Sequence, residues 1–211
     1  MAVRVYDSKT DNRNLEITPE IRTRFVHIAP REVHGRHSHD LGHEVFLVLE
    51  GRLQFHLDDE VIELTAGQCC VVRADQMHQL VNATDEPAIL YLSVSPHIEP
   101  THTMWGEGGE KLPPRYGGAT AQERAQRGEP GPTVSELAVR QEEATRRLLE
   151  RVASAAEASL PLLRSLQQSP GPSEPKATAD EIWGRLYPVF KATSELAAVW
   201  NELSAATAPH P

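Results

Sequence analysis

The fold is decided by one stretch of sequence, Gly35-Arg36-His37-Ser38-His39-Asp40-Leu41-Gly42-His43-Glu44-Val45-Phe46-Leu47-Val48-Leu49-Glu50-Gly51. Within it, His37 and His39 stand two residues apart, so both imidazoles would point to the same face of a strand. Glu44 opens an apolar run typical of a second strand, and Gly51 stands where that strand must turn. The stretch therefore predicts two strands that bring imidazole and carboxylate groups close together.

A second stretch of the chain supplies a further imidazole, because His78 and Asn82 again share one face of an expected strand. Three imidazoles and one carboxylate inside a barrel suit Mn, Fe, Co, Ni, Cu or Zn, and poorly suit Ca or Mg. Four protein ligands on a six-coordinate ion leave neighbouring positions for water, oxygen or substrate, so we expect a reactive site and not a closed structural one. The candidate metal ligands are His37, His39, Glu44 and His78.

Short runs of β-forming residues, separated by turn residues, fill most of residues 22–95. Such runs at close and regular spacing, without helical patterns between them, are typical of a sandwich or barrel of antiparallel sheet. The expected strands are 22–28, 44–50, 53–57, 61–64, 69–73, 78–82 and 88–94.

The two stretches resemble the motifs of the cupin superfamily. Its first motif, H-x-H-x(4)-E-x(6)-G, is matched at every defined position by His37, His39, Glu44 and Gly51. Its second, G-x(5)-P-x-G-x(2)-H-x(3)-N, is matched by Gly67, His78 and Asn82. Where that motif has Pro-x-Gly, this chain has Arg73-Ala74-Asp75, a tripeptide that shapes a turn and provides no ligand.

The resemblance covers about residues 22–95 and implies a mainly β fold, the cupin-type antiparallel β-barrel that is also called a double-stranded β-helix or jelly roll. The superfamily includes dioxygenases, isomerases, decarboxylases, seed storage proteins and sensor domains. The resemblance therefore indicates the fold and leaves the reaction open.

The chain changes character after residue 96, where Pro and Gly are interspersed up to residue 132 in a composition typical of a linker or of a segment that wraps over the barrel. Thr133 then opens a capping box, and apolar residues recur at helical spacing. We expect this first helix to kink or end near Leu160, before Pro161. After a turn at 169–175, Thr178-Ala179-Asp180-Glu181 predicts the start of a second helix, bent at Pro188.

The sequence thus predicts three parts, a cupin barrel (residues 1–100), a linker or wrapping segment (101–132) and a C-terminal α-helical hairpin (133–211). Two antiparallel helices alone bury little surface. We therefore expect the hairpin to pack on the barrel or on a second subunit, and we expect a homodimer.

The formal net charge of −9 lies mostly in the first hundred residues, which argues against a nucleic-acid partner because phosphate binding needs clustered Lys and Arg. We expect no membrane partner either, since no apolar run approaches the roughly 20 residues that span a bilayer. The first residues are too short and too polar for a signal peptide, and the adjacent Cys69 and Cys70 imply no disulfide framework. A cytoplasmic location is the expectation.

Several further side chains have roles that the sequence leaves open. We expect Asn82 to act in a turn, and His43 to lie at the surface because it points away from Glu44. His97 and His102 favour an ordinary loop role, with closure over the barrel mouth as the alternative. A carboxylate substrate could be bound by whichever of four arginines faces the interior: Arg24, Arg36, Arg52 or Arg73.

The functional hypothesis is a metal-dependent enzyme, dioxygenase-like, that holds one divalent transition-metal ion (Fe, Mn, Ni, Zn, Co or Cu) and acts on a small organic substrate. An isomerase or another enzyme that uses the metal as a Lewis acid would need the same ligands. The alternative from a different class is a non-catalytic metal- or small-ligand-binding sensor whose hairpin passes a signal to a partner. The sequence does not identify the catalytic acid and base.

Overall fold

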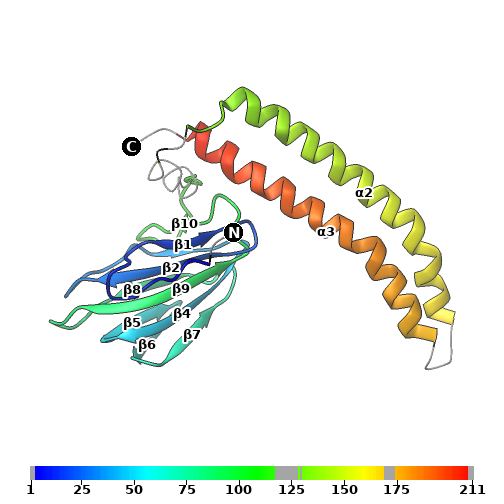
Figure 1. Cartoon of the computed structure of the whole chain (residues 1–211). Helices are drawn as coiled ribbons and strands as arrows, with labels where there is room; N and C mark the ends of the chain where they lie inside the picture. The colour runs from blue at the N-terminus through cyan, green and yellow to red at the C-terminus, as the bar shows by residue number, and fades with distance from the viewer. Residues whose placement is uncertain (1–2, 117–127, 129, 169–173, 209–211) are drawn as a thin grey trace. The chain divides into compact units, whose positions relative to one another are not determined.

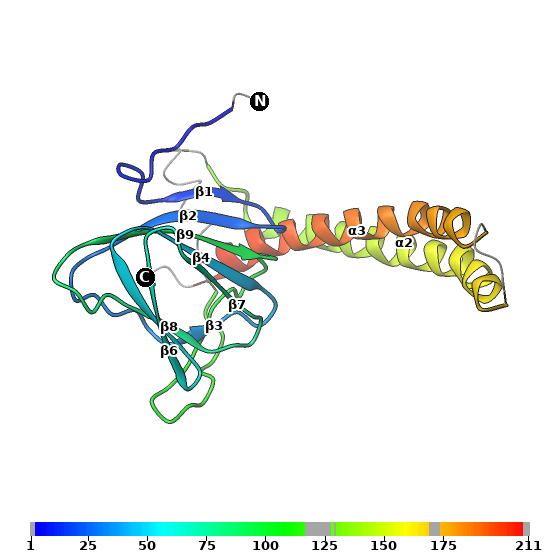
Figure 2. The same cartoon turned by 90° about the horizontal axis from the view of Figure 1, so that it is seen from below.

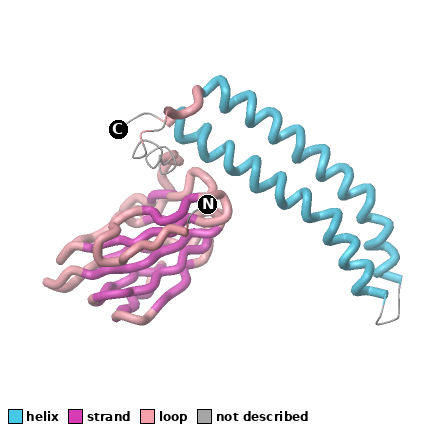
Figure 3. Tube along the Cα trace, viewed as in Figure 1, coloured by secondary structure: helices cyan, strands magenta, loops and turns pink. Residues whose placement is uncertain are grey.

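The computed structural model describes residues 3–116, 128, 130–168 and 174–208. The chain divides into two compact units, residues 1–131 with 204–211, and residues 132–203. The first unit holds the strands and the second is helical, as Figure 3 shows. The predicted class, a mainly β antiparallel barrel followed by a C-terminal helical hairpin, is confirmed.

The barrel consists of short strands in two sheets (Figures 1 and 2). Their bounds are β1 Asn14–Ile17, β2 Arg22–Ile28, β3 His37–Ser38, β4 His43–Glu50, β5 Arg52–Leu57, β6 Glu60–Thr65, β7 Cys69–Val72, β8 His78–Val81, β9 Ala88–Ser95 and β10 Thr103–Met104. The first sheet has the order β1-β2-β9-β4-β7, and the second has the order β10-β3-β8-β5-β6. All the pairings within them are antiparallel.

The expected strands are confirmed, each within one residue at either end. Strands β1, β3 and β10 were not predicted as separate strands. Strands β3 and β10 have two residues each, which is too short for an alternating pattern to appear. They are held by their neighbours, because His37 of β3 pairs with His78 of β8 on one side and with Met104 of β10 on the other.

The inner faces of the sheets are apolar toward one end of the barrel and polar toward the other. On β4 the buried residues alternate as Glu44, Phe46 and Val48. At the apolar end, the fully buried Val48 and Leu90 pair in the middle of the first sheet and belong to the hydrophobic core. Burying each such side chain stabilises the fold by about 1.5–3 kcal/mol, so this end anchors the barrel and the Glu44 end is left for polar groups.

The turn before β8 keeps its shape although it lacks the glycine of the cupin motif. Asp75 has a φ of 65°, in the left-handed region where glycine is usual and where aspartate is tolerated. Its backbone N–H donates to the carbonyl of His39 at 2.9 Å, and its carboxylate accepts from Lys111 at 2.8 Å. The departure at Arg73-Ala74-Asp75 therefore leaves the turn intact.

The described residues just after β9 lie against the barrel. Strand β10 pairs with β3, and the Trp105 indole donates to the Ser38 hydroxyl at 3.0 Å. Residues 117–127 and 129 of the expected linker or wrapping segment lie outside the described residues. The division of the chain at residues 100 and 132 stays a prediction.

The second unit is an antiparallel pair of long helices, α2 (Val134–Gln168) and α3 (Glu174–Thr207), which lie side by side in Figures 1 and 2. The capping box is confirmed, since the hydroxyl of Thr133 accepts from the Glu136 N–H at 3.2 Å and the Glu136 carboxylate accepts from the Thr133 N–H at 2.8 Å. Over their described residues, neither helix has the apolar length that a bilayer requires.

Of the two outcomes expected at Pro161, an end of the helix is wrong, and the start expected for the second helix is also wrong. Helix α2 continues through Pro161 to Gln168, because the carbonyl of Glu157, which loses its N–H partner, lies on the exposed side of the helix. Helix α3 begins at Glu174 and not at Thr178, which places Pro175 in the first turn, where proline is favoured. It continues through Pro188, and the expected turn at 169–173 lies outside the described residues.

The turn between β4 and β5 generates a testable prediction. Gly51 has a φ of +79°, and a Cβ there would lie 2.9 Å from the Pro87 carbonyl oxygen, whereas Gly67 has a φ of +86° with nothing within 4 Å of a Cβ. We expect Gly51→Ala to lower the free energy of unfolding by about 2–4 kcal/mol, from backbone strain and overlap, and Gly67→Ala by about 1 kcal/mol, from strain alone. Urea unfolding followed by circular dichroism measures both, and equal losses would contradict the prediction.

Candidate metal centre

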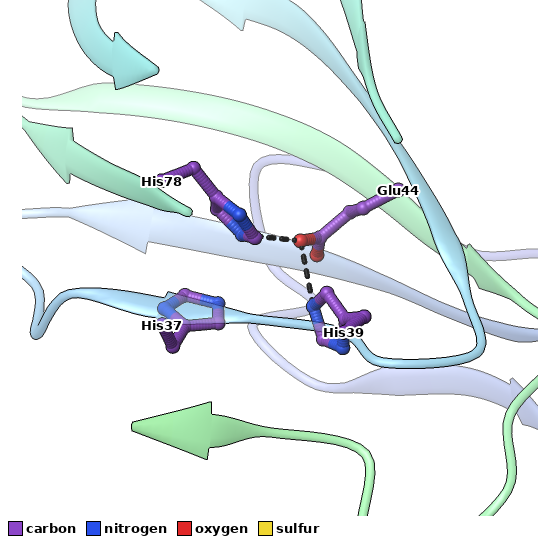
Figure 4. Close-up of side chains that lie close together, drawn as sticks. All are labelled: His37, His39, Glu44 and His78. Atoms are coloured by element: carbon purple, nitrogen blue, oxygen red, sulfur yellow. Dashed lines mark hydrogen bonds and ion pairs between the residues drawn. The ribbon is translucent and has the colours of Figure 1, made fainter. Parts of the chain in front are cut away.

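Four polar side chains converge at the polar end of the barrel (Figure 4). One ligand atom from each lies within 4.8 Å of the others; His37 is half-buried and the other three are buried. The structure therefore brings together all the residues that the sequence proposed as ligands. They are His37 on β3, His39 just after it, Glu44 on β4 and His78 on β8.

A backbone carbonyl oxygen holds the Nδ1 atom of each imidazole. The His37 Nδ1 lies 3.0 Å from the Gly35 oxygen, and the His78 Nδ1 lies 3.0 Å from the Gln76 oxygen. The His39 Nδ1 contacts the carbonyl oxygen of Thr101. Because a carbonyl oxygen only accepts hydrogen bonds, each Nδ1 carries the proton and each Nε2 keeps a lone pair, which is the arrangement of metal-binding histidines.

The Nε2 atoms of His39 and His78 lie 2.9 Å and 3.0 Å from the same carboxylate oxygen of Glu44. If both rings carry their only proton on Nδ1, two lone pairs face an anionic oxygen, so a metal ion or a proton is needed between each ring and the carboxylate. Burial alone raises the pKa of the Glu44 carboxyl, but its contacts with His39 and His78 outweigh burial and hold that pKa well below the ordinary value. The carboxylate is therefore ionised, as a metal ligand must be.

The protonation of His37 also suits metal binding. Burial, together with the neighbouring His78, lowers the pKa of His37 to about 4, so its imidazole is neutral at pH 7. Three imidazoles and one carboxylate match the preferences of first-row transition-metal ions. The side chains present here thus fit the metal that the fold implies. The inner-facing Cys70 is a poor additional ligand, because burial raises the pKa of its thiol to about 11.

Aromatic rings border the four side chains on two sides. The ring of Phe46 lies 5.9 Å from the ring of His78 and 5.0 Å from that of Phe55, which begins the apolar core. The ring of His102 lies 4.7 Å from that of His39 and 5.0 Å from that of His37. Burial and these two histidines lower the pKa of His102 well below its ordinary value, so His102 is neutral beside the site.

His102 lies in the segment after β9, which places its ring against two of the candidate ligands and favours the alternative of closure over the barrel mouth. His97 is likewise buried. Asn82 acts in a turn as expected, since its amide donates to the carbonyls of Ala29 and Glu86 at 3.0 Å and 2.8 Å. His43 is exposed, also as expected.

The arginines divide clearly between the inside and the outside of the barrel. Arg36, Arg52 and Arg73 are exposed, whereas Arg24 lies on the inner face of β2. Arg22, which was not proposed from the sequence, is buried on the same face. The signal that could have identified it is its two-residue spacing from Arg24, which places both side chains on one face of a strand.

Comparison with known proteins agrees with this geometry. A family model described as a cupin domain matches residues 24–95. The polyketide synthase CurC of Streptomyces cyaneus is 36% identical over 67 residues, which are 32% of this chain and 44% of that protein. The matched segment therefore spans less than half of this curated relative.

Solved structures with similar folds each cover half of the chain or less. An uncharacterized protein with a double-stranded beta-helix domain from Klebsiella pneumoniae is 20% identical, with a TM-score of 0.46, over 50% of this chain and 100% of that one. A cupin 2 conserved barrel domain protein from Salinispora arenicola is 23% identical, with a TM-score of 0.38, over 45% and 88%. A salicylate 1,2-dioxygenase from Pseudaminobacter salicylatoxidans is 18% identical, with a TM-score of 0.37, over 39% and 26%.

The contacts between Glu44 and two imidazoles generate a prediction for the metal-free protein. In Glu44→Gln the carboxylate charge that His39 and His78 stabilise is lost, so we expect this variant, without metal, to be about 1–3 kcal/mol less stable than the metal-free wild type. A divalent ion at about 100 times its Kd should stabilise the wild type by about 2.7 kcal/mol, and should stabilise Glu44→Gln far less.

Thermal unfolding with a chelator, and then with Co²⁺, Ni²⁺ or Zn²⁺, measures both effects. Glu63→Gln is the matched control, because Glu63 is a partly exposed carboxylate on β6 outside the cluster. A metal-free Glu44→Gln protein that unfolds at the same or a higher temperature than the wild type would show that His39 and His78 do not stabilise the ionised carboxylate.

Proposed function

Since residues 24–95 of this chain are a cupin domain, we propose that the chain is a metal-dependent enzyme that acts on a small organic substrate. The observation that carries the proposal is the convergence of three imidazoles and one carboxylate in the barrel, with every imidazole Nδ1 held by a backbone carbonyl. A site built only for stability would close all the metal positions with protein ligands. Here four side chains would bind an ion that takes up to six ligands.

His37, His39, Glu44 and His78 would hold one divalent transition-metal ion, which supplies open positions where O2 or a substrate oxygen can be polarised. The chain's own groups prepare that site. The carbonyls of Gly35, Gln76 and Thr101 fix the orientation of the rings, and the charge of Glu44 offsets part of the charge of the ion. Phe46 and Phe55 exclude water from the side next to the core, which strengthens every electrostatic contact inside.

We propose O2-dependent oxidation, of the dioxygenase type, as the reaction. The mixed nitrogen and oxygen donor set suits the redox-active ions Fe and Mn, which supports this choice, and it also suits Zn or Ni acting as a Lewis acid in an isomerase. The curated relative is named a polyketide synthase, so polyketides are the first substrate class to test.

The first experiment is elemental analysis of the purified full chain beside the His37→Ala/His78→Ala double variant. We expect about one equivalent of a transition metal in the wild type and none in the double variant. His43→Ala is the control, because the exposed His43 neighbours Glu44 in sequence and lies outside the cluster, and its metal content should match the wild type. Absence of metal, even after reconstitution with each ion, would overturn the enzyme proposal.

The second measurement is O2 consumption by the metal-loaded chain with phenolic and 1,3-diketone polyketides. Consumption that is lost in the double variant supports a dioxygenase. Conversion of substrate without O2 consumption would identify the isomerase alternative. Metal binding without turnover of any substrate would support the alternative of a non-catalytic sensor.

The homodimer expected from the sequence stays a prediction, and one feature of α3 favours it. Trp183, Tyr187 and Phe190 are 57%, 51% and 55% exposed, and the Trp183 ring lies 5.9 Å from each of the other two. Exposed clusters of large apolar side chains mark interaction surfaces. We propose that this aromatic cluster on α3 contacts a second copy of the chain.

Light scattering after gel filtration tests the dimer. We expect twice the chain mass for the wild type and the mass of one chain for Trp183→Ser/Phe190→Ser. Val61→Ser, an equally exposed apolar side chain on β6, should leave the dimer unchanged. A wild-type monomer, or a dimer that survives the double substitution, would rule out this interface.

A further inference from the structure

We propose that Arg22 and Arg24 form an anion site inside the barrel, and that this site binds the carboxylate of a small organic acid beside the metal centre. The inference rests on the proposed function and narrows it, because it assigns the chemical class of the substrate. Three observations support it: the strand register of the two arginines, the exposure of the residues around them, and the balance of charge inside the barrel.

The strand register places both arginines on the face that carries the metal centre. Arg22 pairs with Val94 of β9, and Val94 pairs with Glu44 of β4. Two strand spacings therefore separate Arg22 from Glu44, or roughly 10 Å between their Cα atoms. Arg24 lies in the next row, where it pairs with Leu92, and Leu92 in turn pairs with Phe46. Glu44 acts electrostatically on both guanidinium groups, so both lie within range of its charge.

Two members of the row that contains Arg24 keep some contact with solvent. Leu92 on the central strand β9 faces inward and is only partly buried, and so is Arg24. Phe46, which completes the row, is buried, and so are the rows on either side, Arg22, Val94 and Glu44 on one and Val26, Leu90 and Val48 on the other. Arg24 and Leu92 are therefore the exposed part of this region of the inner face, which a small molecule can contact.

The two guanidinium groups differ in how their charge is balanced. The Nε of Arg22 donates to the Asn14 side chain at 3.0 Å, and the buried carboxylate of Glu99 acts on Arg22. The Nε of Arg24 is shielded from solvent and has no hydrogen-bond partner among the described residues. A buried charged donor without a partner is costly, so an external acceptor would relieve Arg24 more than Arg22.

The charges inside the barrel favour a ligand with a negative charge. Glu44 is the acidic side chain that acts on Arg24, and it is also the anionic ligand of the proposed metal. Burial lowers the pKa of Arg24, yet a guanidinium stays protonated at pH 7. Arg22 and Arg24 balance the charges of Glu44 and Glu99, so a divalent ion in place gives the interior excess positive charge. An anionic ligand restores the balance.

The guanidinium group also sets the geometry of the ligand. Its planar fork matches the two oxygens of a carboxylate and forms two parallel charge-assisted hydrogen bonds. The apolar neighbours Leu92 and Phe46 suit the organic part of such an acid. The substrate class is therefore a small organic carboxylate, whose remaining oxygen atoms can extend toward the histidines.

Calorimetric titration of the metal-loaded full chain tests the site. The probes are benzoate, malonate and pyruvate, and each is paired with its neutral amide: benzamide, malonamide and pyruvamide. We expect at least one carboxylate to bind the wild type, with its amide binding roughly tenfold more weakly or worse. Arg24→Gln should lose a similar factor for the carboxylate, and Arg24→Lys should lose less. Arg52→Gln, an exposed arginine of the barrel, should bind as the wild type does.

Thermal unfolding and metal content separate a binding role from a structural one. Since Arg24 makes no hydrogen bond to any described residue that Gln would break, we expect Arg24→Gln to unfold at the same or a higher temperature and to keep its metal. If the wild type holds no metal, the proposed function fails, but carboxylate binding by the metal-free chain that is lost in Arg24→Gln still supports the anion site.

Three results would overturn the anion site. They are carboxylate binding that is unchanged in Arg24→Gln, amides that bind as tightly as their acids, and a metal-loaded wild type that binds none of the three carboxylates. Tighter binding of inorganic phosphate than of any carboxylate would overturn the assigned substrate class.

Discussion

Three hydrogen bonds from imidazole Nδ1 atoms to backbone carbonyl oxygens determine what the barrel can do. They place the proton of each histidine on the outward nitrogen and leave a lone pair on the inward one. Two of the carbonyls belong to residues two positions before their histidines, so the local backbone of β3 and β8 sets those rings. The third comes from Thr101, which is 62 residues after His39, and therefore depends on the completed fold.

The polar end of the barrel is built at the expense of stability, and the other end offsets that cost. Glu44, Arg22 and Arg24 stand on inner-face positions that an ordinary barrel would fill with apolar side chains. Each of these groups is costly to bury unless a partner compensates its charge. The closely packed rows around Val48 and Leu90 supply the hydrophobic stabilisation that makes such positions tolerable.

The sequence predicted the strands well where apolar residues alternate or run continuously, and poorly where a strand is too short to show either pattern. The strands with alternating or continuous apolar runs were placed within a residue, whereas β3 and β10 depend on pairing with neighbours. The four candidate ligands were found because their spacing along two strands determines which face they share. His102 and the Thr101 carbonyl could not be found in this way, because they follow the last long strand and are positioned by contacts between distant residues.

The face that Arg22 and Arg24 occupy shows a different limit of sequence reasoning. Two arginines on one face of a strand usually indicate the solvent side, and the apolar residues of β2 do not alternate clearly enough to decide between the faces. Only the register with β9 and β4 shows that these side chains point inward. A prediction from hydrophobicity alone therefore assigns charged residues at the end of a barrel to the solvent face, even where they point inward.

The contact between His39 and Thr101 links the mobility of one segment to the retention of the ion. Thr101 lies in the same segment as His102, which covers His37 and His39. If this segment swung outward, it would free the His39 ring at the moment that it uncovered the site. Outward movement of this segment would therefore weaken the proposed metal centre as it opens the site. In the proposed enzyme, exchange of substrate and product by a route that leaves this segment in place would keep the metal ion bound.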